Sequence, residues 1–132
     1  MAAYEQALSI VSLPTTSTGL KQYRFVTLNS GGNVVYTSAS GSAIGVLQGG
    51  TTGSTVHPVS VPVAIAGISK VANATASSMA AGDLVAATSR GSIKAMAAAS
   101  PVVGVVVSGS SGGANRVSYV LLAGLTASTA TV

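Results

Sequence analysis

The chain has 132 residues, enough for one domain with a buried core, but only 6% of them are charged, against roughly 25% in ordinary soluble domains. This scarcity favours a subunit that hides much of its surface in an assembly over a free monomer coated with Ser, Thr and Gly. The basic residues that give the net charge of +4 are scattered along the chain, which argues against a nucleic-acid-binding stripe. The absence of cysteine excludes disulfides and thiolate metal sites. No apolar run is long enough to predict a membrane span.

Residues 1–20 are expected to form an N-terminal arm and linker. A run of breaker residues follows its large apolar side chains, which are Tyr4, Leu8, Ile10, Val11 and Leu13. Residues 2–8 have room for one or two helical turns, which are too short to be stable alone. We expect this arm to order against a neighbouring subunit, the alternative being a frayed terminus.

A first group of strands is predicted after the arm. Residues 23–28 are rich in β-formers, an Asn/Gly turn follows, and the return strand and a short apolar run come next at 34–37 and 43–48. Residues 59–66 alternate between Val or Ile and smaller residues, which is the period of a strand with one buried face. Because proline cannot donate to a sheet ladder, Pro58 and Pro62 predict an edge strand or a bulge here.

The second half of the chain repeats this order. Residues 73–81 fit a short helical turn or a crossover loop, and further strands are expected at 84–88, 92–96, 102–107 and 116–123. Val26 and Gly45 recur 59 positions later as Val85 and Gly104, and the offset becomes 57 after the next turn. We therefore expect two similar β units, at about 23–71 and 82–124.

Short strands with Gly-rich turns predict an all-β fold, a compact barrel or sandwich that spans residues 21–124 and precedes a tail at 125–132. Gly45 and Gly104 stand inside apolar strands, where glycine weakens a strand unless the geometry requires it. Both are expected at a bend, a bulge or a close backbone approach.

Catalytic chemistry is not expected. The chain has one His, one Glu and one Asp, so neither paired carboxylates nor a metal site around His57 can be assembled. Residues 109–113 match the G-x-S-x-G pattern of a nucleophile elbow, but a strand is predicted after it where that fold needs a helix. We predict no enzyme activity, no cofactor and no metal.

The order of these elements resembles the small capsid decoration, or cement, proteins of tailed bacteriophages. The resemblance runs from about residue 23 to residue 123, and rests on the pieces Ala43-Ile44-Gly45-Val46-Leu47, Val59 to Val71, Met79-Ala80-Ala81-Gly82-Asp83-Leu84-Val85, Arg90-Gly91-Ser92-Ile93, Val102-Val103-Gly104-Val105 and Val117 to Leu122. It implies a compact β fold, commonly trimeric, on the outer capsid surface of a virion whose shell is built from an HK97-like major capsid protein.

The expected partners follow from this resemblance and from the composition. We expect a homo-oligomer, a trimer by resemblance, that contacts the major capsid protein and binds neither nucleic acid nor membrane. The apolar arm is the candidate contact segment, and Lys21 and Arg24 would add salt-sensitive attraction to the shell. The alternative is a tail, fibre or adhesin module that binds a host ligand. The absence of Trp disfavours it, since adhesive surfaces are usually rich in aromatic anchors.

Overall fold

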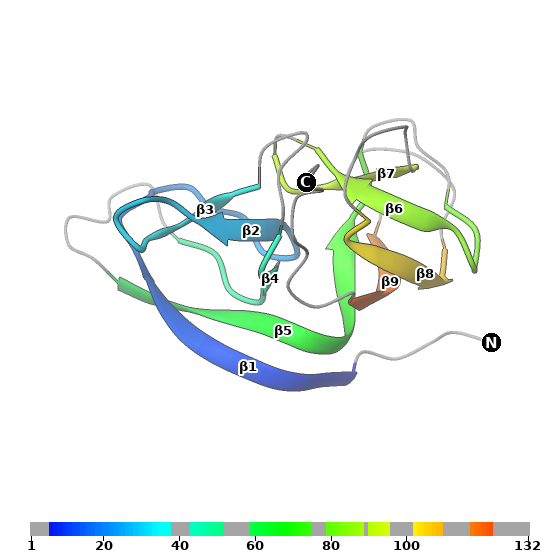
Figure 1. Cartoon of the computed structure of the whole chain (residues 1–132), viewed down its shortest axis with the longest axis horizontal. Helices are drawn as coiled ribbons and strands as arrows, with labels where there is room; N and C mark the ends of the chain where they lie inside the picture. The colour runs from blue at the N-terminus through cyan, green and yellow to red at the C-terminus, as the bar shows by residue number, and fades with distance from the viewer. Residues whose placement is uncertain are drawn as a thin grey trace, which may run out of the picture.

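The computed structural model describes residues 6–37, 43–51, 59–74, 79–88, 90–95, 102–109 and 117–122, and its regular elements are all β-strands (Figure 1). The strands are β1 (Gln6–Thr15), β2 (Phe25–Leu28), β3 (Val34–Tyr36), β4 (Gly45–Leu47), β5 (Val59–Ala72), β6 (Leu84–Ala87), β7 (Ile93–Ala95), β8 (Gly104–Ser108) and β9 (Val117–Leu122). The all-β prediction is confirmed.

The expected helical turns are not found among the described residues. Residues 6–8 belong to β1, and residues 73, 74 and 79–81 are not helical, while 1–5 and 75–78 lie outside the described part of the chain. The prediction for 2–8 was wrong for the residues that can be checked because pairing with a neighbouring strand overrides a weak local propensity for helix.

The long strand β5 organises the sheet, which is a single antiparallel sheet rather than the two sheets of a sandwich. Ala64 pairs with Ile10 of β1 and with Val46 of β4, and Ile68 pairs with Gln6 of β1 and with Leu121 of β9. Each strand has two edges, so β1 follows one edge of β5, and β4 and β9 share the other edge at different heights. Beyond β4 come β2 and β3, and beyond β9 come β8, β6 and β7 (Figure 1).

This arrangement corrects one of the two expectations for the prolines, because β5 is a central strand and not an edge. The other expectation, a bulge, has a counterpart in the register shift between β1 and β5 near Ala64 and Ala66. Gln48 N donates to Pro62 O at 2.8 Å. The N and O of one strand residue point toward the same edge, so the missing N–H of Pro62 faces Gln48, just beyond the end of β4. The reciprocal hydrogen bond of this pair, from residue 62 N to Gln48 O, is the one that proline cannot make, and Gln48 O accepts from Gln22 Nε2 at 2.9 Å instead. Pro58 lies outside the described residues.

The two units, β2–β5 and β6–β9, have the same strand pairings. Val26 faces Gly45 in the first unit, and the residues 59 positions later, Val85 and Gly104, face each other in the second. Leu47 faces Val63 in the first unit. The equivalent residues of the second unit, Val106 (59 positions after Leu47) and Val120 (57 positions after Val63), also face each other. The repeat seen in the sequence is therefore also a repeat of strand register.

Backbone hydrogen bonds outside the strands repeat as well. Ile44 N donates to Val26 O at 2.9 Å, and its equivalent Val103 N donates to Val85 O at 3.0 Å. Tyr23 N donates to Leu47 O, and Gly82 N donates to Val106 O, each at 2.7 Å. Both Tyr23 and Gly82 have a positive φ, of 64° and 91°. The same backbone path thus begins both units, although one begins with a tyrosine in a conformation that usually selects glycine.

Each unit presents two apolar rows, one on each face of its strands. We call Val26, Leu47 and Val63 the inner row of the first unit, and they lie in one buried cluster with Leu20, Val34 and Val61. The residues next to them along the strands form the outer row, which is Phe25, Val46 and Ala64, all at most 1% exposed.

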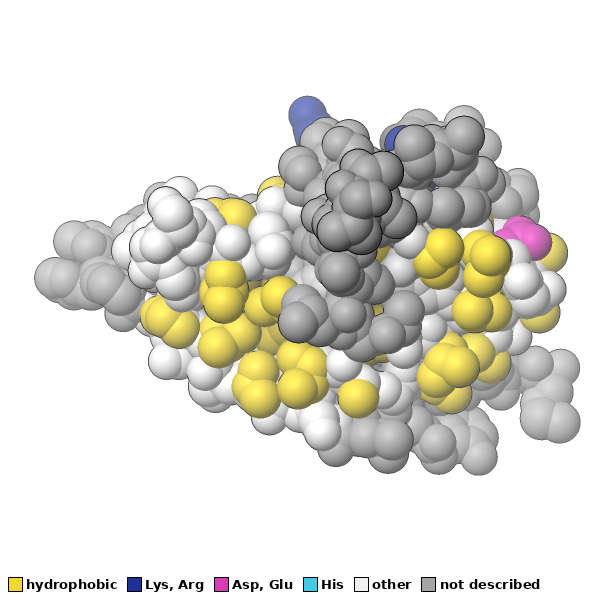
Figure 2. All heavy atoms as spheres, in the orientation of Figure 1, with side chains coloured by type: hydrophobic (Ala, Val, Ile, Leu, Met, Phe, Trp, Pro, Cys, Tyr) yellow, Lys and Arg dark blue, Asp and Glu magenta, His cyan; other side chains and the backbone are white. Residues whose placement is uncertain are grey.

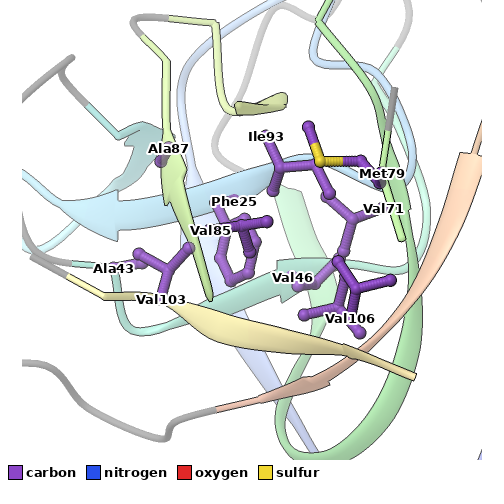
Figure 3. Packing of buried hydrophobic residues seen from close by; sticks show 11 residues of the cluster. Phe25, Ala43, Val46, Val71, Met79, Val85, Ala87, Ile93, Val103 and Val106 are labelled. Carbon is purple, nitrogen blue, oxygen red and sulfur yellow. The ribbon is translucent and has the colours of Figure 1, made fainter. Parts of the chain in front are cut away.

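The outer row of the first unit packs on the inner row of the second. Phe25 and Val46 share a buried cluster with Val85, Val106 and Val120 (Figure 3). In Figure 3, Phe25 lies next to Val85, and Val46 lies next to Val106. The second core is therefore built by stacking one unit on the other, with valines filling most of it.

Residues 6–15 are a strand of the sheet, which corrects the expected arm for this part of the chain. β1 pairs with β5 from Gln6 opposite Ile68 to Thr15 opposite Val59. Val11 and Leu13 pack against the cluster of the first unit, and the buried Thr15 Oγ1 donates to Val34 O at 2.7 Å. Alternate apolar side chains cover this core, so the neighbour against which the segment orders is its own chain.

Substitutions on β1 test this placement. Leu13 packs on the core, whereas its neighbour Ser12 is exposed on the opposite face. Leu13→Ala is expected to lower the free energy of unfolding by about 1–2 kcal/mol, less than a fully buried leucine because Leu13 is half-buried. Ser12→Ala serves as the control and should change it by less than about 0.5 kcal/mol. Urea denaturation measures both, and equal values would contradict the inward orientation of Leu13.

Candidate functional site

The structure describes the side chains of four of the six residues predicted to contact a partner. Tyr4 lies outside the described residues, and Leu8 lies in β1 with its side chain outside them. Ile10 is 54% exposed, whereas Leu13 packs on the core of its own chain. The two predicted arm contacts whose side chains the structure describes, Ile10 and Leu13, therefore do not form one contact surface.

Lys21 and Arg24 do come together, in a surface pocket with a volume of about 340 Å³. The described residues that line this pocket, here called the basic pocket, are Gly19, Lys21, Arg24, Tyr36 and Arg90. Lys21 and Arg24 precede β2, Tyr36 ends β3, and Arg90 lies in the turn between β6 and β7. Three cationic side chains from both units thus line one depression, and none of its described lining residues is acidic.

Backbone contacts hold the pocket together. Phe25 N donates to Gly91 O at 2.7 Å, which places the turn containing Arg90 on the segment containing Arg24. Gly91 has φ of 76°, and a Cβ there would lie 2.9 Å from Arg24 Cβ and still closer to Phe25 O. Only glycine permits this approach without displacement. On the other side of the pocket, Lys21 N donates to Tyr36 Oη at 2.7 Å.

The Arg24 guanidinium is only partly bonded. Its Nη1 donates to Arg90 O at 3.3 Å, while its buried Nε has no hydrogen-bond partner among the described residues. A buried donor without an acceptor costs free energy comparable to that of a lost hydrogen bond. The Arg24 side chain therefore has an unsatisfied buried donor, and it lines a pocket with an excess of positive charge that an anion would relieve.

A second feature of the surface is the outer row of the second unit, Leu84, Val105 and Leu121. These residues lie directly opposite one another on β6, β8 and β9, and Ile68 of β5 continues the row. Leu84 is 48% exposed and Leu121 is 47% exposed. We call these four residues the apolar face. Figure 2 shows hydrophobic side chains gathered over β6 and β8, in the part of the molecule where this face lies.

The repeat gives the apolar face a buried counterpart. Leu84, Val105 and Leu121 are the equivalents of Phe25, Val46 and Ala64 at offsets of 59, 59 and 57. Within the chain, the first unit buries this row under the second unit, and the second unit has no described third unit to cover its own row. Sequence reasoning missed this surface, and the signal that locates it is the offset of the repeat.

The candidate residues for chemistry are dispersed or lie outside the described residues. Among the described residues, no three His, Cys, Asp or Glu side chains are grouped so as to hold a metal. Asp83 Oδ2 accepts a hydrogen bond from Ala80 N at 3.0 Å and so closes the turn before β6. His57 and residues 110–113 of the G-x-S-x-G motif lie outside the described part of the chain. No described helix is both long and apolar enough to cross a bilayer.

Comparison with known proteins adds a structural relative. No protein-family model and no curated protein sequence matches the chain. Among solved structures, the fold is similar to the head fiber gp8.5 N base of bacteriophage phi29, with a TM-score of 0.67 and 14% sequence identity. The match covers 90% of this chain and 98% of that chain. At this identity the likeness shows a shared fold, which extends over nearly the whole of both chains.

Proposed function

We propose that this chain is a structural subunit of a tailed-phage virion, and that a homo-oligomer of it decorates and stabilises the outer surface of the capsid. Two independent lines support this proposal. The sequence resembles capsid decoration proteins, and the fold is similar to the base of a phage head fibre. On this proposal the chain is not an enzyme and needs no cofactor.

The observation that carries the self-association is the apolar face. The outer row is buried in the first unit, whereas in the second unit the same row consists of aliphatic side chains of which Leu84 and Leu121 are about half-exposed. The residues of the apolar face, which include Leu84, Leu121 and Ile68, carry no charged group that would keep this face hydrated. Exposed apolar rows of this kind mark protein interfaces, and in a chain with 6% charged residues a second copy is the partner we assign to it. A trimer is the state that the family resemblance implies.

The capsid is the second partner in this proposal. The basic pocket opens on the surface of the chain, and we assign it to the contact with the capsid. The pocket contains Lys21 and Arg24, which the sequence analysis assigned to a capsid contact, together with Arg90 and Tyr36. A subunit that touches more than one HK97-like capsid subunit opposes their separation, and its binding free energy then adds to particle stability.

The alternative is a fibre component, and the phi29 head fibre base is the specific observation that favours it. The two functions differ in copy number. A shell decoration protein is present in hundreds of copies per particle, whereas a tail, fibre or adhesin module is present in a handful. Quantitative gel densitometry of purified virions therefore separates the two.

Rebinding to particles that lack the protein tests the decoration function directly. We expect the purified protein to bind to such particles until it saturates the shell, and to raise the temperature at which they release DNA. Raising the salt concentration should weaken binding, because the basic pocket contributes attraction that salt screens. Absence of binding at saturating protein, measured by co-sedimentation, would reject the capsid assignment and leave the fibre or adhesin function.

A further inference from the structure

We propose that the basic pocket is a receptor for a carboxylate side chain, Asp or Glu, which a partner protein inserts between Arg24 and Arg90. The identity of that partner as a capsid subunit rests on the proposed function. The chemistry of the site does not, since it follows from the residues that line the pocket.

The first argument is charge. Lys21, Arg24 and Arg90 line a pocket with no described acidic residue, and no carboxylate among the described residues pairs with any of the three. Like charges held together repel one another unless an anion or salt screens them. The two units bring these cations together from sequence positions up to 69 residues apart. A bound carboxylate would neutralise part of this charge and so favour both the pocket and the complex.

The second argument is the shape of the Arg24 guanidinium. It has two forked edges, and Nη1, which donates to Arg90 O, does not belong to the edge formed by Nε and Nη2. No described residue accepts a hydrogen bond from that edge, and its Nε is the buried donor without a partner. A planar carboxylate matches such a fork with two parallel hydrogen bonds. Arg24 as a whole is half-exposed and lines the pocket, but its Nε is buried, so binding requires the side chain to turn this edge toward the pocket.

The third argument is a hydroxyl that is already oriented. Tyr36 Oη accepts a hydrogen bond from Lys21 N, which uses a lone pair and leaves the Tyr36 hydroxyl hydrogen to donate. No described residue accepts that hydrogen. The pocket thus offers one hydroxyl donor and one planar fork, beside the charges of Lys21 and Arg90. Sulfate and phosphate also match an arginine fork. We assign a carboxylate because the partner is a protein, whose anionic side chains are Asp and Glu, and the inorganic anions are therefore competitors in the test.

The test is a titration of the full-length protein with a capped tetraglutamate peptide, followed by the NMR signals of the arginine Nε–Hε groups. We expect the Arg24 signal to shift saturably. Arg24→Gln, followed on the Arg90 signal, and Arg90→Gln, followed on the Arg24 signal, should each weaken peptide binding at least about tenfold, the loss that follows when a hydrogen bond to a charged group is removed. Arg24→Lys keeps the charge and removes the fork, and it should weaken binding as well.

Lys94→Gln is the matched control, since it makes the same change in net charge at a residue of β7 that does not line the pocket. If Lys94→Gln weakens the peptide as much as Arg24→Gln does, the attraction is a general effect of net charge and the site is rejected. If inorganic sulfate or phosphate shifts the Arg24 signal at equal or lower concentration, the carboxylate assignment is wrong. An Arg24 signal that does not move also overturns the proposal.

This experiment uses no particles, so its failure differs from failure of the proposed function. If the protein decorates capsids but does not bind the peptide, the proposed function is supported and the carboxylate site is rejected. If the protein binds the peptide through Arg24 but does not bind the particles, the carboxylate site is supported and the capsid function is rejected.

Discussion

Gly104→Ala is expected to lower the free energy of unfolding by about 3 kcal/mol, the upper part of the range for overpacking a core. A Cβ at this position would lie 2.7 Å from Leu121 O and even closer to Val120 Cγ1. The first of these atoms belongs to the backbone of β9, and Val120 is fully buried between the two units, so neither can move aside freely. The strand would have to separate from β9 or distort.

Gly45→Ala should have an effect of the same size, because the repeat places Gly45 in the same surroundings. Its Cβ would lie 2.9 Å from Val63 Cγ1 and closer still to Ala64 O, and Ala64 and Val63 are the equivalents of Leu121 and Val120. The role that the sequence suggested for these two glycines, a close backbone approach, is the one that the structure gives them.

Gly31→Ala is the matched control for both variants. Its Cβ would meet only the side chains of Asn29 and Asn33, each at 3.4 Å, and the residue is exposed in the turn after β2. We expect a change of less than about 0.5 kcal/mol. Urea denaturation of the three variants measures the difference. If Gly104→Ala and Gly45→Ala are as stable as Gly31→Ala, the close approach of the strands is not real.

The repeat and the strands were readable from the sequence because both depend on local patterns. β-branched residues, Asn/Gly turns and a recurring interval placed most of the strands that the structure contains. β1 was not recognised, because Gln6 to Thr15 has a pattern that also fits a short helix followed by a linker. Its strand conformation depends on β5, which lies more than 40 residues further along the chain, and no local signal reports such pairing.

The candidate site was only half readable. Lys21 and Arg24 stand close to each other in the sequence and were selected as charges near a partner. Arg90 was missed, since it belongs to the basic pocket only because Gly91 lets its turn pack against Phe25. The sequence shows a glycine after Arg90, which is the mark of a turn, but it does not show which segment that turn will touch.

The apolar face illustrates a different limit. The rows Phe25–Val46–Ala64 and Leu84–Val105–Leu121 are both apolar, and their sequence patterns give no reason to expect one to be buried and the other exposed. Their fates differ because the units stack in one order: the second unit covers the first, and nothing described in the chain covers the second. Sequence identifies equivalent residues, while the direction of stacking decides which of them remain available to another molecule.

Leu121→Lys is expected to convert the homo-oligomer that we propose into monomers. In the assembly that we propose, residue 121 is buried against a second copy, so the lysine would bring an unpaired charge into an apolar contact. The association constant should fall by at least about a hundredfold, since excluding an unpaired charge from water costs several kcal/mol. The monomer should still fold, because Leu121 is 47% exposed in the single chain and a lysine there reaches solvent. Sedimentation equilibrium measures the association, and circular dichroism checks the fold.

Leu28→Lys provides the control, because Leu28 is 41% exposed on β2 and lies outside the apolar face. It introduces the same charge on the other unit and should leave the association constant within about threefold of that of the unchanged protein. A Leu121→Lys protein that associates as strongly as the Leu28→Lys protein would place the self-interface elsewhere. An unchanged protein that sediments as a monomer at every concentration would remove the second copy as the occupant of the face. The four residues that extend the buried pattern of the first unit would then have to be covered by a different partner, with the capsid surface the first to examine.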